Sequence, residues 1–166
     1  VSGKGVPASL FMAITRSLFR TLSQHVLSPA KIVTEMNNSI SDNNESNMFV
    51  TLIVGILDLE TGILKLCNAG HNPPILIYPD GQVSYLEFKT QIFVGVVEDF
   101  KYSDEEVVLE KESKLFLYTD GVTEAENINK ELYGEEKLLE MLSDNASSDV
   151  RTTVNVVVDS IASHVK

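Results

Sequence analysis

Apolar residues recur at two different spacings along this chain, and these spacings predict a succession of helices and strands. Between residues 7 and 26 the apolar positions follow one another at intervals of four, which is typical of an amphipathic helix that buries one face. These positions are Leu10, Ile14, Leu18 and Leu22, with Phe11 beside them. A second helix is expected to begin at Pro29 and to continue through Ile40, since proline is favoured in the first turn of a helix. The polar residues 41–47 then predict a loop.

The middle of the chain is predicted to be a block of mostly antiparallel strands. Its first segment is apolar on both faces, which favours a strand covered on both sides. Turn residues at 60–62 and 79–81 predict two hairpins. The predicted strands cover 48–57, 63–68, 75–78, 83–88, 106–109 and 114–119, and the last two helices cover 133–142 and most of 149–165. The order of two helices, a strand block and two helices predicts an α+β fold with helices packed on sheets.

Composition narrows the classes of function. With 166 residues, 43% of them hydrophobic, the chain fits a single domain with a sizeable core. Its net charge of −11 argues against binding to nucleic acid or to anionic membrane. No apolar stretch approaches the roughly 18 residues of a membrane span. The only cysteine, Cys67, cannot form an internal disulfide, which fits a small core residue and a reducing cytoplasm.

The strongest candidate for chemistry is a carboxylate at the end of an apolar run. Residues 115–119 lead directly to Asp120, which Gly121 follows, and Glu124 comes four residues later. A buried strand that ends in a carboxylate needs a partner for the charge, and a hard metal ion is a natural one. Asp-Gly is also a common pair in hairpin turns. This pattern alone is therefore also consistent with a turn that has only a structural role.

Two other segments are weaker candidates. Residues 2–5 are rich in glycine but lack the GxxxxGK[ST] pattern of a nucleotide-binding loop. His71 and Asn72 stand before two prolines. The histidine is either a metal ligand or a group that ties the loop together by hydrogen bonds, and such a lone histidine more often does the latter.

Taken in order, these segments resemble the metal-dependent protein phosphatases of the PPM family, and most closely the bacterial SpoIIE/RsbU-like serine phosphatases. The strings that carry the resemblance are VSGKGVPASLFMA, MFVTLIVGILDLETG, NAGHNPP, YTDGVTEAEN and LYGEEKL. The resemblance covers about residues 1–142. It implies an α-β-β-α sandwich of two antiparallel sheets flanked by helices, with a binuclear Mn²⁺ or Mg²⁺ centre held by aspartates.

The resemblance also implies roles for particular residues. Asp120 matches the metal-binding aspartate of the family's TDG motif, and Val1 matches the residue whose backbone carbonyl contacts metal. Gly121, Glu124, His71 and Asn72 are supporting candidates. The family's metal-bridging aspartate would stand just before Val1, and neither its first strands nor its last metal motif is found. We therefore expect residues 1–166 to be one partial phosphatase domain, truncated at both ends.

The implied activity is hydrolysis of phosphoserine or phosphothreonine in a regulatory protein, by resemblance one of the anti-anti-sigma type, in cytoplasmic bacterial signalling. The metals would activate a bridging water, and no catalytic side chain beyond their ligands is implied. Ser2 stands where eukaryotic relatives carry a histidine thought to be the general acid. The resemblance further implies a preceding sensor or receiver domain and is compatible with a homodimer. Two alternatives stay open: a non-catalytic regulatory binding module with a degenerate phosphatase fold, and a structural domain in which Asp120 is only a turn residue.

Overall fold

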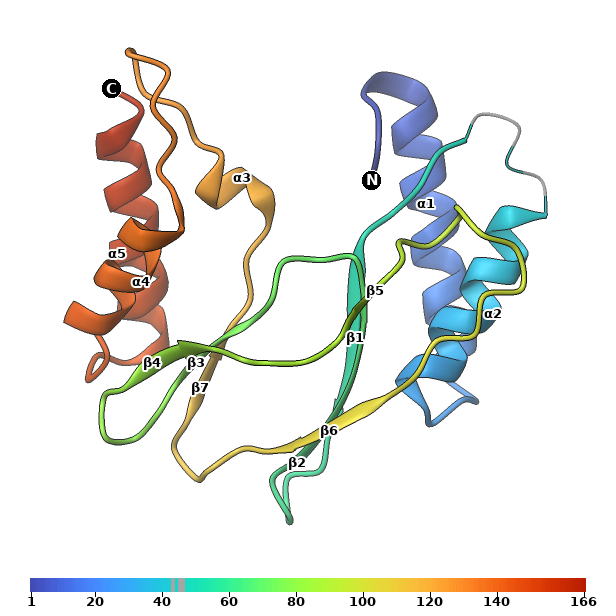
Figure 1. Cartoon of the computed structure of the whole chain (residues 1–166), viewed down its shortest axis with the longest axis horizontal. Helices are drawn as coiled ribbons and strands as arrows, with labels where there is room; N and C mark the ends of the chain where they lie inside the picture. The colour runs from blue at the N-terminus through green and yellow to red at the C-terminus, as the bar shows by residue number, and fades with distance from the viewer. Residues whose placement is uncertain (43, 45–46) are drawn as a thin grey trace. The chain divides into compact units, whose positions relative to one another are not determined.

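The computed structural model describes residues 1–42, 44 and 47–166, and these form two compact units. Unit 1 comprises Val1–His71 and Phe88–Leu109, and unit 2 comprises Asn72–Glu87 and Glu110–Lys166. The loop expected at 41–47 includes residues 43, 45 and 46, which lie outside the described part of the chain. Figure 1 labels the helices and strands, and each unit is described separately below.

Unit 1 contains one mixed sheet and two helices. Its elements are α1 (Gly5–Leu22), α2 (Pro29–Ser41), β1 (Leu52–Leu57), β2 (Ile63–Ala69), β5 (Thr90–Gln91) and β6 (Glu105–Val108). β1 pairs antiparallel with one edge of β2, so that Leu52 lies opposite Ala69 and Leu57 opposite Leu64. β6 and β5 share the other edge of β2, β6 antiparallel and β5 parallel. The sequence pattern missed β5, because a pair of only two residues carries no periodicity.

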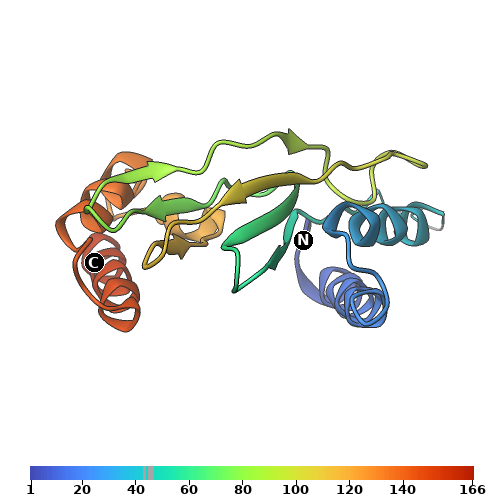
Figure 2. The same ribbon diagram turned by 90° about the horizontal axis from the view of Figure 1, so that it is seen from below.

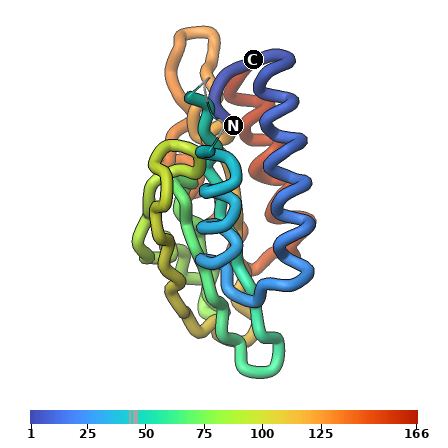
Figure 3. Tube along the Cα trace, turned by 90° about the vertical axis from the view of Figure 1, so that its right-hand side faces the viewer, coloured from blue at the N-terminus to red at the C-terminus, as the bar shows by residue number. Residues whose placement is uncertain are grey.

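The second helix covers the sheet of unit 1. Its buried positions include Ile32, Val33, Met36 and Ile40, as the sequence pattern predicted. They form a core cluster with Val54 of β1 and with residues of β2. Figure 3 shows α1 and α2 running alongside one another.

The apolar stripe expected on the first helix is wrong in part. Leu10 and Ile14 are 60% and 55% exposed, whereas Phe11, Leu18 and Leu22 pack against the core cluster. The predicted inward face is therefore right for Leu18 and Leu22 in the second half of the helix and wrong for Leu10 and Ile14 in the first half. The predicted cover over both faces of the first strand is also wrong, since Gly55 and Leu57 of β1 are exposed.

Unit 2 contains a three-stranded antiparallel sheet and three helices. Its elements are β3 (Ile75–Ile77), β4 (Val83–Tyr85), β7 (Lys114–Phe116), α3 (Asp120–Thr123), α4 (Glu135–Asp144) and α5 (Val150–His164). β3 is the central strand, with β4 and β7 on its two sides. Figure 2 shows α4 and α5 beside one another, and their buried residues share a core cluster with β3. The ammonium of Lys114 donates to the carbonyls of Ala146 and Ser148, at 2.5 and 2.6 Å, and so joins β7 to the α4–α5 connection.

Two features of unit 2 differ from the sequence expectation. The strands expected at 83–88 and 114–119 end early, at Tyr85 and Phe116, and α3 stands where the Asp120-Gly121 pair had left a turn open. The last two helices agree with the predicted ones, apart from shifts of one to two residues at their ends. Within the described residues, no helix combines the length and apolar character needed to cross a membrane.

Candidate metal centre

Asp120 lies at the start of a short helix that follows a strand. β7 ends at Phe116, residues 117–119 are irregular, and Asp120 is the first residue of α3. Its carboxylate is exposed to solvent, and its Oδ1 accepts a hydrogen bond from the Gly121 N–H at 2.8 Å. Gly121 is helical and does not have a positive φ, so the Asp-Gly hairpin turn that the sequence left open is wrong here.

Glu124 stands one helical turn beyond Asp120. It is the C-cap residue of α3, and its N–H donates to the Asp120 carbonyl at 2.7 Å. The Glu124 side chain is exposed, as is that of Asp120. The helix therefore places two carboxylates on neighbouring turns of the same surface segment.

His71 ties together the loop after β2 in unit 1. Its N–H donates to Asn68 Oδ1 at 2.8 Å, and Asn68 Nδ2 donates back to the His71 carbonyl at 2.9 Å. The imidazole Nδ1 is also 3.2 Å from the hydroxyl of Thr51. These contacts give His71 the loop-fixing geometry that one of the two sequence interpretations described.

The N-terminal loop is fixed by reciprocal hydrogen bonds. The Ser2 N–H donates to the Phe49 carbonyl at 2.8 Å, and the Ser2 hydroxyl accepts from the Phe49 N–H at the same distance. Val1 is 37% exposed and belongs to unit 1, whereas Asp120 belongs to unit 2. Ser2 therefore has a structural role in holding the loop that carries Val1.

Sequence reasoning missed a pair of buried phenols in unit 2. The hydroxyls of Tyr85 and Tyr118 are shielded from solvent and have no hydrogen-bond partner among the described residues. Burial, and then the neighbouring Tyr118 hydroxyl, raises the pKa of Tyr85 well above its ordinary value. Both phenols therefore stay protonated at neutral pH. The sequence contains no signal for this pair, because β4 and the segment after β7 meet only in the folded unit.

Asp120 fits the role of one metal ligand but not of a whole site. A hard divalent cation prefers carboxylate oxygens, and this carboxylate is exposed and held by its own helix. Mn²⁺ and Mg²⁺ each take about six oxygen ligands. Across residues 1–42, 44 and 47–166, no group of three or more His, Cys, Asp or Glu side chains is arranged to hold a metal ion. A complete centre therefore needs oxygens beyond those that these residues bring together.

Two curated bacterial proteins are similar to this chain over almost its whole length. The Protein IcfG of Synechocystis sp. (strain ATCC 27184 / PCC 6803 / Kazusa) is 26% identical over 192 residues, covering 99% of this chain and 30% of IcfG. The Phosphoserine phosphatase RsbU of Bacillus subtilis (strain 168) is 26% identical over 162 residues, covering 97% of this chain and 48% of RsbU. The chain thus spans half or less of the length of these relatives.

Solved structures show the same fold at low sequence identity. The RsbU and RsbW domains of Rv1364c from Mycobacterium tuberculosis match with a TM-score of 0.83 and 22% identity, covering 99% of this chain and 46% of that one. The SiaA-PP2C domain of Pseudomonas aeruginosa also matches with a TM-score of 0.83, at 20% identity, covering 98% of this chain and 65% of that one. RsbX in complex with magnesium matches with a TM-score of 0.68 and 17% identity, covering 98% of this chain and 69% of that one. These matches confirm the expected α+β class, with helices and mainly antiparallel sheets.

A family model completes the comparison. The model described as Stage II sporulation protein E (SpoIIE) matches residues 1–166, the whole length of the sequence. The match thus extends past residue 142, the approximate end of the resemblance seen in the sequence. The chain belongs to the SpoIIE family.

Proposed function

We propose that residues 1–166 are part of one phosphatase domain, and that this domain is a metal-dependent protein serine/threonine phosphatase. The observation that carries the proposal is the exposed Asp120 carboxylate, fixed at the start of α3 in a chain that belongs to the SpoIIE family throughout. The similarity to RsbU, which is named a phosphoserine phosphatase, supports the choice of substrate class. From the resemblance of its motifs to the SpoIIE/RsbU-like phosphatases, we propose a regulatory phosphoprotein of the anti-anti-sigma type as the substrate.

The chemistry is shared between bound Mn²⁺ or Mg²⁺ and the residues of the chain. When bound, the ions activate water and neutralise charge on the phosphoryl group. Asp120 would supply a carboxylate ligand. The backbone carbonyl of Val1 is proposed separately as a metal contact, from the resemblance of its motif. Glu124 adds negative charge one turn away from Asp120. We assign Ser2 no general-acid role, because an aliphatic hydroxyl keeps its proton at neutral pH. Its oxygen instead accepts a hydrogen bond from the Phe49 N–H.

The charge of the chain supports a role for cations. With a net charge of −11, the chain repels a phosphorylated substrate unless positive charge is present at the site. A divalent ion beside Asp120 provides it. We also propose a cytoplasmic location, which suits the free and buried thiol of Cys67. We further propose that a sensor or receiver domain precedes this domain in the full-length protein and regulates it. We also propose that the protein forms a homodimer.

Replacing Asp120 in the full-length protein tests the proposal. Asp120→Asn keeps the shape and removes the charge, so we expect Mn²⁺-dependent hydrolysis of a phosphoserine peptide to fall by more than about 100-fold, the upper range for loss of a group that only supports a ligand. Asp80→Asn is a matched control. Asp80 is also an exposed aspartate of unit 2, and its Oδ1 also accepts a backbone N–H, from Gln82 at 2.9 Å.

The possible outcomes separate the competing functions. Full turnover by Asp120→Asn would remove this residue from the chemistry. A full-length protein that binds a phosphoprotein, with no turnover at any Mn²⁺ concentration, would favour the regulatory binding module. Equal losses in Asp120→Asn and Asp80→Asn would point to a general effect of removing surface charge.

A further inference from the structure

Residues 126–132 of unit 2 form a hairpin shortly after α3 (Figure 1), closed by an antiparallel bridge between its first and last residues. At its tip, the Asn127 Oδ1 accepts from the N–H groups of Asn129 and Glu131, both at 2.9 Å. Asn127 Nδ2 donates to the Glu131 carboxylate at 2.8 Å. One side chain thus fixes the turn by three hydrogen bonds.

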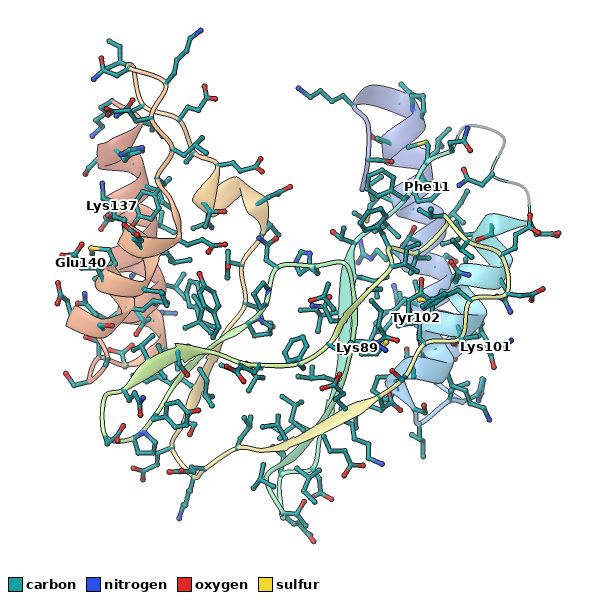
Figure 4. The ribbon with its side chains drawn as sticks, in the orientation of Figure 1. Phe11, Lys89, Lys101, Tyr102, Lys137 and Glu140 are labelled. Atoms are coloured by element: carbon teal, nitrogen blue, oxygen red, sulfur yellow. The ribbon has the colours of Figure 1, made fainter. Side chains whose placement is uncertain are left out.

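The base of this hairpin is fixed to the core and to both long helices of unit 2. Tyr133, the residue after it, is 3% exposed, and its hydroxyl donates to Ser160 of α5 at 2.9 Å. Lys137 of α4 lies over the Tyr133 ring, 5.0 Å from its centroid (Figure 4), and its ammonium is 3.4 Å from His164 Nδ1. Since an ammonium can only donate, Nδ1 accepts, and the Nε2–H of His164 donates to the Glu131 carbonyl at 3.0 Å. The hairpin is therefore held against both α4 and α5.

Two backbone hydrogen bonds also join the hairpin to the segment that begins at Asp120. The Tyr133 N–H donates to the Ala125 carbonyl at 2.8 Å, and the Gly134 N–H donates to the Thr123 carbonyl at 3.0 Å. Counted at the rise of a helix and then of a strand, the residues from Asp120 to the tip span at most about 21 Å. An extended peptide covers this distance in about six residues. A protein segment whose phosphoserine reaches Asp120 is therefore long enough to meet the tip.

The side chain at the tip is apolar. Ile128 is 82% exposed, and Leu132 on the returning limb is 54% exposed. A single exposed apolar side chain is common on protein surfaces. Ile128 differs because its hairpin is fixed and is attached to the segment of Asp120, so an apolar partner would bind it with little loss of conformational freedom. Its β-branched side chain is itself restricted to few rotamers.

Acidic side chains surround this apolar tip. Glu124, Glu126 and Glu131 are exposed, whereas Lys130 is the one basic residue between positions 120 and 134. An occupant with complementary charge is basic. The chemistry of the hairpin thus fits a segment that has both apolar and basic side chains.

We propose that Ile128 is a docking residue for the phosphoprotein substrate, and that it contacts an apolar side chain within about six residues of the phosphoserine. Basic residues of the same segment face the glutamates of the hairpin. This inference rests on the proposed function, because it takes the phosphoserine to lie at Asp120. Ile128 does not touch the reacting atoms; it selects which phosphoserine segments bind.

Two phosphoserine peptides and a small phosphate ester test this role in the full-length protein with Mn²⁺. Both peptides have about 15 residues, a central phosphoserine and the same lysines, and they carry either leucine or serine about four to six positions from the phosphoserine. p-Nitrophenyl phosphate is too small to reach the hairpin. We expect the unaltered protein to favour the leucine peptide about tenfold in kcat/KM, the order of effect of one apolar contact. Ile128→Ser should reduce this preference to within about twofold and leave hydrolysis of p-nitrophenyl phosphate unchanged.

Leu59→Ser is the matched control. Leu59 is 88% exposed at the turn between β1 and β2 in unit 1, where the Asp58 carboxylate accepts from the N–H groups of Glu60 and Thr61 at 2.9 and 3.0 Å. It is thus also an apolar side chain on a turn fixed by one side chain, but it does not belong to the segment of Asp120. Its substitution should leave the peptide preference as it is in the unaltered protein.

Asp120→Asn, run beside these variants, separates the two hypotheses. If Asp120→Asn loses turnover while Ile128→Ser keeps the full preference for the leucine peptide, the docking role is overturned and the proposed function stands. If Asp120→Asn hydrolyses all three substrates at the full rate, the proposed function fails, and the docking role fails with it. An equal loss of preference in Leu59→Ser, or a loss of p-nitrophenyl phosphate hydrolysis in Ile128→Ser, would also overturn the docking role.

Discussion

Asn37 offers a quantitative test of how unit 1 is held together. It is fully buried on α2. Its Nδ2 donates to the Val97 carbonyl at 2.8 Å, and its Oδ1 accepts from the buried Gly95 N–H at 2.9 Å. Both contacts fix the connection after β5 to the helix. Asn37→Ala removes them together, so the variant should loosen this connection more than the rest of unit 1.

The magnitude follows from what the substitution leaves behind. A buried N–H without a partner costs about 1–3 kcal/mol, and loss of the second hydrogen bond costs about 0.5–1.5 kcal/mol. The free energy of local opening should therefore fall by roughly 2–4 kcal/mol. Since about 1.4 kcal/mol corresponds to a factor of ten, amide exchange should speed up by roughly 30- to 700-fold.

Hydrogen exchange of peptides covering residues 92–99 measures this change. Asn38→Ala is the control, since Asn38 is the next residue on α2 and its Oδ1 has no hydrogen-bond partner among the described residues. Both variants gain the same helix propensity from alanine, which therefore cancels in the comparison. Equal exchange rates in Asn37→Ala and Asn38→Ala would refute the assignment of these hydrogen bonds as the main tie.

Two further predictions concern single ionisable groups. Burial, and then the nearby Asp104 carboxylate, raises the pKa of the Cys67 thiol to about 12. Iodoacetamide at pH 8 should therefore modify the native chain roughly a thousandfold more slowly than the chain in urea, and similar rates would contradict this burial. At the start of α5, the N–H and hydroxyl of Thr152, and then the Arg151 N–H, lower the pKa of Asp149 below its ordinary 3.8. The stabilisation is thus present above about pH 4 and is lost as pH falls through the lower, folded-state pKa. Asp149→Ala should reduce the exchange protection of α5 at pH 7 and have less effect toward pH 3, whereas a constant difference would contradict this.

The helices and hairpins with strong local signals were predictable from sequence. Pro29 and the spacing of Ile32, Met36 and Ile40 gave α2 and its buried face. The turns at 60–62 and 79–81 gave the two hairpins. These elements depend on residues only a few positions apart, so their physical causes lie within a short window of sequence.

The candidate site was predictable only as a residue and not as an environment. The apolar run before Asp120 identified this carboxylate as a candidate metal ligand. The sequence did not show that Asp120 begins a helix or that its side chain is exposed. Nor did it show that the hydroxyls of Tyr118 and of Tyr85, more than thirty positions earlier, would both be buried. Those features depend on which distant segments pack together.

The first helix illustrates the difference between what the order of residues determines and what tertiary packing determines. Periodicity established that α1 is amphipathic, and the motifs placed the chain in its family, because both are written in the order of residues. Periodicity predicted one inward stripe through Leu10, Ile14, Leu18 and Leu22, with Phe11 beside it. Contact with the core cluster of unit 1 uses Phe11, Leu18 and Leu22 and leaves Leu10 and Ile14 exposed. The sequence by itself thus determined most of the helices and hairpins, the family and the acid at position 120. The two-residue strand β5, the burial of individual side chains and the inward face of α1 were decided only by packing between segments far apart in the chain.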